Sequence, residues 1–195
     1  MTLMPFSRTA PTDPQADPAR EARPETWTPE GVTVSQRFLG LAGAIALVYT
    51  ADAGVNGAYY AVTCLGCWFS IKSKGGPYNY FASPREAGVV ANEHAAQCRA
   101  LNGPLPERPD DATARKFIRR ILDRQRRSED VTVSLNEFHL DRLALQRSTA
   151  WIEDELQRLA AEQPDFLAAK PRSYGPGTEF TIVRFKADAV HTAGR

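Results

Sequence analysis

The chain has 195 residues, which is enough for one medium-sized domain or two small ones. Its formal net charge is +1, so no strong overall positive field points to a nucleic-acid partner. Three cysteines, together with the lack of an apolar secretory segment near residue 1, argue against a disulfide-stabilised secreted protein and favour a cytoplasmic location.

The first 50 residues divide into a polar segment and an apolar one. Residues 1–30 are rich in proline and charged side chains, and such a segment buries too little apolar surface to offset the entropy lost on ordering. We therefore predict a disordered tail there. The most apolar run of the chain, Phe38–Tyr49, is shorter than the roughly 20 residues that cross a bilayer. We interpret it as a buried helix or strand pair, and we expect no membrane segment.

Cysteine and histidine residues form the pattern C-x2-C-x26-H-x3-C within residues 31–102. Cys64 and Cys67 lie between two stretches of strand composition. His94 and Cys98 are four residues apart on a predicted helix, so both side chains project from one face. Two thiolates from a tight turn and two ligands from one helix suit a tetrahedral, structural zinc ion. We therefore predict a zinc-binding, ββα-like domain over residues 31–102.

The helix in this pattern has a clear start. Ser83 is the expected N-cap and Glu86 its capping-box partner, and we expect the helix to continue to about Leu101. The 26-residue gap is about twice the spacing of common zinc fingers, so the alternative is that the three cysteines are core residues and His94 a surface residue. Four protein ligands leave no position for a reactive water, which argues against a catalytic zinc.

The second half of the chain predicts another domain. The proline-rich stretch at residues 103–111 is typical of a linker. We expect the domain itself over residues 112–187 and a tail over residues 188–195. The domain would begin with a basic amphipathic helix from about residue 113. The elements expected after it are a short strand at 131–133, helices at 135–143 and 148–161, and a two-stranded ribbon. The fold class expected for the whole chain is α+β.

Helix, tight turn, helix and ribbon form the order of a winged helix-turn-helix. Two sequence details, RST at 147–149 and GxGTxF at 175–180, also resemble the DNA-binding domain of gluconate-repressor-type bacterial regulators. The resemblance covers under half of the chain. It implies a sequence-specific protein that binds double-stranded DNA and regulates transcription, encoded by a bacterium, phage or plasmid.

In such a domain, the second helix of the pair enters the major groove, where its first residues meet the base edges. Arginine can bind guanine through two hydrogen bonds, and hydroxyl side chains can bind phosphate. The basic first helix could add phosphate contacts, the alternative being a solvated arginine face. The predicted DNA-binding residues are Gln146, Arg147, Ser148, Thr149, Trp151, Arg142, Lys170 and Arg172.

Acidic residues on the same helix favour a different function. Glu153, Asp154 and Glu155 would be repelled by DNA phosphates. The alternative is an adaptor protein that uses the winged helix and the zinc domain as docking surfaces for a protein partner or a second copy. Acids on the exposed face of the helix would favour this alternative. The sequence has no paired-carboxylate, nucleophile or phosphate-loop motif, so we predict no enzymatic activity.

Overall fold

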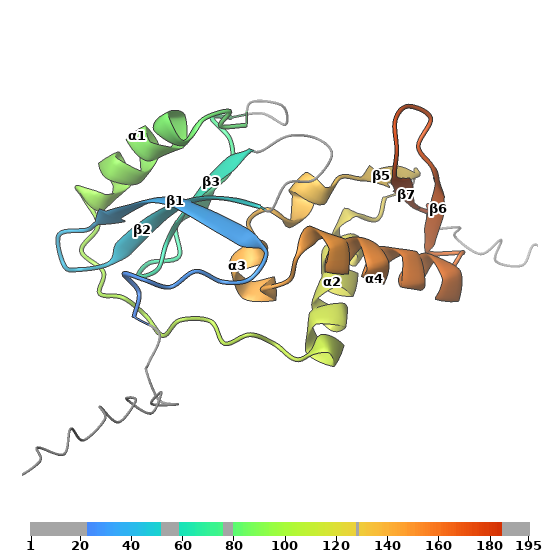
Figure 1. Ribbon diagram of the computed structural model, residues 1–195, viewed down its shortest axis with the longest axis horizontal. Helices are drawn as coiled ribbons and strands as arrows, with labels where there is room; N and C mark the ends of the chain where they lie inside the picture. Colours follow the sequence, from blue (N-terminus) through green and yellow to red (C-terminus); the bar gives the residue numbers. More distant parts are fainter. Residues whose placement is uncertain (1–22, 52–58, 76–79, 128, 185–195) are drawn as a thin grey trace, which may run out of the picture.

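The computed structural model describes residues 23–51, 59–75, 80–127 and 129–184. These residues form an α+β structure with a four-stranded antiparallel sheet, a three-stranded antiparallel sheet and four α-helices (Figure 1). None of these helices combines the length and apolar character needed to span a membrane. We refer to residues 23–98 as the sheet lobe and to residues 111–184 as the helical lobe.

The sheet lobe is built on four antiparallel strands in the order β1-β2-β3-β4. They are β1 (Val32–Leu39), β2 (Ile45–Ala51), β3 (Tyr60–Cys64) and β4 (Ser70–Ile71). Residues Ile45–Tyr49 of β2 are all buried because β2 is covered on both faces. The apolar run that we interpreted as a buried helix or strand pair is a strand pair, the end of β1 followed by β2. Its burial is only partial, because Leu39 and Leu41 are exposed.

Helix α1 (Pro84–Ala95) covers one face of this sheet (Figure 1). Ser83 accepts a hydrogen bond from the backbone N–H of Glu86, as the capping pattern predicts. Small residues of α1, among them Ala87 and Ala91, pack in the same core as Val48 and Val62. The expected end near Leu101 was wrong, because the helix stops at Ala95 and the chain turns away.

The helical lobe consists of seven elements, three of which have only three or four residues. They are α2 (Asp111–Gln125), β5 (Val131–Val133), the 3₁₀ helix η1 (Leu135–Phe138), α3 (Arg142–Leu145), α4 (Thr149–Glu162), β6 (Leu167–Pro171) and β7 (Thr178–Ile182). The strands pair in the order β5-β7-β6. The single helix predicted over 135–143 was wrong: η1 and α3 replace it. The 3₁₀ bonds Glu137 N–H to Ser134 O and His139 N–H to Asn136 O form in its first half.

The second face of the four-stranded sheet packs against the helical lobe. Leu143 of α3 belongs to the same core cluster as Ile45, Leu47 and Tyr49 of β2. The Tyr49 hydroxyl also donates a hydrogen bond to the carbonyl of His139 at 3.2 Å. A shared apolar core fixes one lobe on the other more firmly than a polar contact would.

The segment before β1 differs in part from the expected disordered tail. Residues 1–22 lie outside the described residues. Trp27, however, is buried in the core that the two lobes share. The carbonyl of Trp27 accepts a hydrogen bond from the Arg37 guanidinium at 2.9 Å. Residues 23–30 thus belong to the folded structure because Trp27 supplies apolar area that the polar average composition of the segment conceals. The predicted tail at 188–195 also lies outside the described residues.

Candidate metal centre

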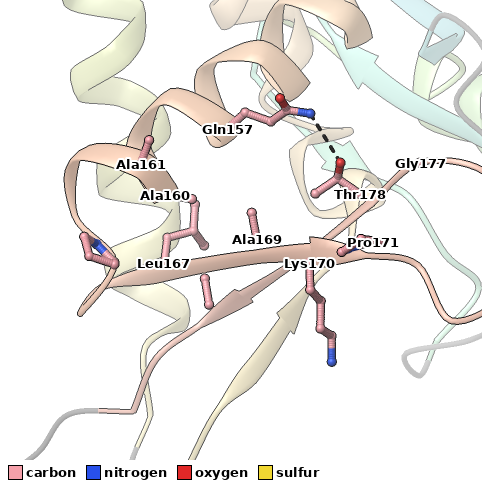
Figure 2. A pocket seen from close by; sticks show the side chains of 11 residues that line it. Gln157, Ala160, Ala161, Leu167, Ala169, Lys170, Pro171, Gly177 and Thr178 are labelled. Carbon is pink, nitrogen blue, oxygen red and sulfur yellow. Dashed lines mark hydrogen bonds between the residues drawn. The ribbon is translucent and has the colours of Figure 1, made fainter.

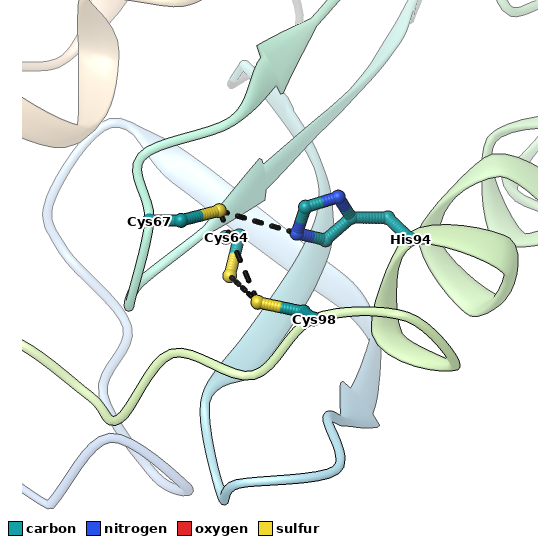
Figure 3. A group of neighbouring side chains, drawn as sticks. All are labelled: Cys64, Cys67, His94 and Cys98. Carbon is teal, nitrogen blue, oxygen red and sulfur yellow. Dashed lines mark hydrogen bonds between the residues drawn. The ribbon is translucent and has the colours of Figure 1, made fainter.

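Four metal-ligating side chains converge at one end of the sheet lobe (Figure 3). Cys64 ends β3, and Cys67 lies in the turn between β3 and β4. His94 is in the last turn of α1, and Cys98 follows the helix, with its backbone N–H bonded to the His94 carbonyl. All four ligand atoms lie within 4.8 Å of one another. The structure therefore brings together all four predicted ligands.

The distances fit a tetrahedral ion. With Zn–S bonds of about 2.3 Å, sulfur ligands of a regular tetrahedron lie about 3.8 Å apart. The Sγ atoms of Cys64 and Cys98 are 3.8 Å apart, and those of Cys67 and Cys98 are 3.9 Å apart. Cys67 Sγ is 3.3 Å from His94 Nε2. These separations are far above the 2.05 Å or so of a disulfide bond, and the three cysteines are free.

The chain between Cys64 and Cys67 is a tight turn. The Cys64 N–H donates to the Phe69 carbonyl at 2.9 Å, and the Trp68 N–H donates to the Cys64 carbonyl at 3.0 Å. Trp68 has a φ of 60°, in the left-handed region, which allows the reversal. A Cβ atom on Gly66 would lie 2.5 Å from the Leu101 carbonyl oxygen, so only glycine fits there. This turn directs both thiols of the pair to the same side.

Backbone N–H groups of the turn also affect the two thiols. Burial raises the pKa of the Cys64 thiol, although hydrogen bonds from the backbone of Cys67 and Gly66 oppose this effect. Desolvation by burial would raise the pKa of the Cys67 thiol. Hydrogen bonds with the Phe69 backbone and with the neighbouring thiols outweigh this effect, so the pKa of Cys67 is lowered. Such N–H groups stabilise thiolates, and the thiolate is the form that binds a metal.

One supporting side chain was not predicted from the sequence. The Phe69 ring stacks on the His94 ring with centroids 4.4 Å apart and an interplanar angle of 8°. The stack holds the imidazole in the orientation that presents Nε2 to the cysteines. Phe69 comes two residues after Cys67. An aromatic residue just after the Cys64–Cys67 turn was therefore the signal in the sequence that could have indicated this contact.

The centre is partly closed to solvent. Cys64 and Cys98 are buried, His94 is half-buried and Cys67 is exposed. Four protein donors around one point leave no vacant corner of a tetrahedron for a substrate or a reactive water. The chemistry that this arrangement offers is metal binding that ties β3, the turn and the end of α1 together.

Comparisons with known proteins do not extend these observations. No family model, no curated protein and no solved structure matches the chain. The function of this protein therefore has to be inferred from its own residues.

Four of the residues predicted to bind DNA, which lie in α3 and around the start of α4, are buried. Arg142 and Arg147 are each 1% exposed, and Gln146 and Thr149 are also buried. In this conformation these four side chains are not available to DNA, so their predicted contacts with DNA stay predictions. The segment before α2 lies against them: Arg147 donates to the Pro109 carbonyl and to Asp111, and Gln146 donates to the Pro106 carbonyl. Gly31 of the sheet lobe contacts the Arg147 backbone.

The remaining predicted DNA contacts have local structural partners. Ser148 caps α4 by accepting from the Trp151 N–H at 3.1 Å, and the Trp151 ring lies beside the Arg147 guanidinium. Lys170 forms an ion pair with Glu179 at 2.8 Å. Arg172 donates to the Thr178 carbonyl at the base of the β6–β7 turn. Of the predicted DNA-binding residues, Lys170 and Arg172 lie on the ribbon, away from the covered start of α4.

The three consecutive acidic residues of α4 differ in exposure. Asp154 is exposed and Glu153 is half-buried. Glu155 is buried, where it accepts hydrogen bonds from Arg115 at 3.0 Å and from Arg158. The outer surface of α4 therefore presents acidic side chains, while the predicted base-reading arginine lies inside.

Proposed function

We propose that the chain is a non-catalytic DNA-binding protein whose sheet lobe is stabilised by a structural zinc ion. Three thiolates and one imidazole are a donor set of structural zinc sites, and the separations above fit zinc bond lengths. A closed site of this kind adds folding free energy to a lobe with a small core.

The helical lobe supports the proposal through its order of elements. A basic helix, a short strand, two helices and a ribbon, with the sheet order β5-β7-β6, agree with a winged helix-turn-helix. The covered start of α4 cannot enter a major groove in this conformation. We therefore place the DNA contact on another surface of the same lobe.

The distribution of charge between α2 and α4 carries the proposal. Residues 111–127, which are α2 and the two residues after it, contain seven basic and two acidic side chains. Helix α4 contains four acidic and one basic side chain. A surface that binds the phosphate backbone must be basic. On this criterion α2 is the DNA-binding helix of the lobe, and α4 is not.

Three exposed cations line one side of α2, and a fourth follows the helix. Lys116, Arg120 and Arg124 follow each other at four-residue steps on α2, each step advancing about 6 Å along the helix axis, and Arg127 comes just after it. Arg124 has only a distant ion pair, 3.9 Å from Asp141. No carboxylate within the described part of the chain pairs with Lys116 or Arg120. This row, the α2 cation row, can contact successive phosphates of one strand.

A salt titration tests the proposal. Binding of the full chain to a labelled DNA duplex is measured by fluorescence anisotropy at several salt concentrations. The double variant Lys116→Gln/Arg120→Gln should weaken binding and reduce the slope of log affinity against log salt by about two. Lys170→Gln, a cation of the ribbon, is the matched control and should change little. An unchanged slope for the double variant, or a larger effect of Lys170→Gln, would contradict the assignment to α2.

A second function is favoured by one observation. The acids Glu153 and Asp154 lie on the outer side of α4, which is the arrangement that we expected of an adaptor protein. In that case α4 would bind the basic surface of a protein partner. The titration also separates the two functions, because an adaptor without a DNA partner would bind no duplex at any salt concentration.

A further inference from the structure

A groove of about 600 Å³ runs between α4 and β6 (Figure 2). Its lining includes five consecutive residues, Leu167–Pro171, and the α4 residues Gln157, Ala160 and Ala161. Successive side chains of a strand point to opposite faces, so a groove lined by five consecutive residues follows the edge of the strand. Strand β7 occupies one edge of β6, and in the described structure no strand pairs with the other. The groove therefore runs beside the unpaired edge, and it ends at Gly177 and Thr178, where β7 begins.

The hydrogen bonds of β6 define what this edge offers. Val183 N–H donates to Phe166 O, and Arg172 N–H donates to Gly177 O, at the two ends of the β6–β7 ladder. Bonded and non-bonded pairs alternate in an antiparallel ladder. Ala168 and Lys170 therefore bond to β7, and the backbone groups of Leu167, Ala169 and Pro171 point to the open edge.

Not all of these outward groups are available. The Leu167 N–H already donates to the Gln163 carbonyl at 3.0 Å, and Pro171 has no N–H. The open edge thus presents one donor, the Ala169 N–H. Its acceptors are the carbonyl oxygens of Leu167, Ala169 and Pro171.

From this pattern we propose that the β6 edge binds an extended segment of another protein as an added strand. A strand with its own free N–H groups could bond to the single donor and to all three acceptors. A second copy of β6 would bring the same single donor, so two copies paired at Ala169 would share only two hydrogen bonds. The edge therefore suits a different chain better than it suits itself.

The side chains of the groove define the partner further. Figure 2 shows Ala169 directed toward α4 and Lys170 directed to the opposite side of the strand. Ala160, Ala161 and Ala169 give an apolar floor without bulky side chains. Lys170 is already paired with Glu179. We expect a segment with alternating residues, apolar on the side that faces α4 and polar on the side of Lys170.

Peptide selection on the full chain tests this surface, and does so independently of DNA binding. Random peptides displayed on phage are selected on the wild-type protein, and the affinity of the enriched peptides is measured by calorimetry. Ala169→Pro removes the outward N–H, which takes no part in the pairing with β7. It should reduce affinity by about tenfold or more. Ala161→Trp, at an exposed position of α4, should block the groove without altering the strand.

Two controls complete the experiment. Gln97→Ala, at an exposed position of the sheet lobe that does not line the groove, should bind the peptides as the wild type does. Lys116→Gln/Arg120→Gln, on the α2 cation row, should also leave peptide affinity unchanged. The proposal is overturned if no peptide is enriched, or if the peptides bind Ala169→Pro and Ala161→Trp as tightly as the wild type. It is also overturned if sedimentation shows a wild-type dimer that Ala169→Pro abolishes, because the edge would then pair with a second copy.

Discussion

A Cβ atom added to Gly31 would lie 2.6 Å from the carbonyl carbon of Arg147, and closer still to its oxygen. Gly31 has a φ of +81°, which favours glycine. The Arg147 guanidinium in turn donates to the Pro109 carbonyl at 2.6 Å. The residue before β1, the segment before α2 and the start of α4 thus meet at one point. This contact explains why the start of α4 is unavailable to DNA.

Gly31→Ala should therefore destabilise the protein by about 3 kcal/mol, since it combines a steric overlap with an unfavourable φ. Gly43→Ala is the matched control, because Gly43 has a φ of +98° but no atom within 4 Å of an added Cβ. Gly43→Ala should lower the free energy of unfolding by only about 1 kcal/mol. Urea denaturation of both variants gives the comparison. Equal losses would mean that the two lobes do not meet at Gly31.

His139 gives the protein a dependence of stability on pH. Burial, assisted by the positive charge of Arg142, lowers the pKa of this histidine to about 4. The unfolded chain, with an ordinary pKa near 6.5, binds the proton at a higher pH than the folded chain does. The contribution of neutral His139 to the free energy of unfolding is therefore fully present above about pH 6.5. The free energy of unfolding should decrease by up to about 3 kcal/mol as the pH falls toward 4.

His139→Leu is the variant that isolates this effect. Denaturation of wild type and variant is measured between pH 4 and 7. Acid also protonates metal ligands, but it does so in both proteins, so only the difference between them reports on His139. The free energy of unfolding of the wild type minus that of the variant should decrease as the pH falls from about 6.5 toward 4. A constant difference would show that His139 does not remain neutral in the folded protein.

Glu155 and Asp154 should respond differently to neutralisation. Glu155 is buried between Arg115 and Arg158, so Glu155→Gln should cost about 1–2 kcal/mol through weakened charged hydrogen bonds. Asp154 is exposed, and Asp154→Asn should change stability by less than about 0.5 kcal/mol. Thermal unfolding of the two variants measures both effects. A larger loss for Asp154→Asn would show that Asp154, and not Glu155, is the acid that stabilises the fold.

The metal ligands were predictable because their signals are local. Cys64 and Cys67 share one turn. His94 and Cys98 are four residues apart, and although α1 ends at Ala95, the Cys98 N–H still bonds to the His94 carbonyl. Sequence spacing therefore nearly determines how each pair is placed. Helix α4 was likewise predictable from its apolar period, and the structure adds Ser148 as its N-cap. The end of α1 was harder to place, because most residues from 96 to 101 have high helix propensity.

The burial of Arg147 could not be found in the same way. Its partners Pro109 and Gly31 are distant in the sequence, and no local pattern indicates that they cover it. A motif at the start of a helix predicts the helix, but not whether another lobe packs over that end. The open edge of β6 depends in the same way on strand order, which is a property of the whole sheet.

Loss of one metal ligand should unfold the sheet lobe in part. Cys98→Ser removes a buried sulfur from the cluster and should lower zinc affinity by at least about a hundredfold and stability by several kcal/mol. Gln97→Ala, at the exposed neighbouring position, is the control and should behave as the wild type. Competition with a chromogenic chelator gives the affinities. Equal affinities for the two variants would exclude Cys98 as a ligand.

X-ray absorption at the zinc edge, measured on the full chain purified without chelator, tests the metal centre most directly. One zinc ion per chain is expected, with three sulfur ligands at about 2.3 Å, one nitrogen at about 2.0 Å and no bound water. Such a spectrum would identify Cys64, Cys67, His94 and Cys98 as a closed structural site. A chain without stoichiometric zinc, or a spectrum in which oxygen replaces sulfur, would contradict it.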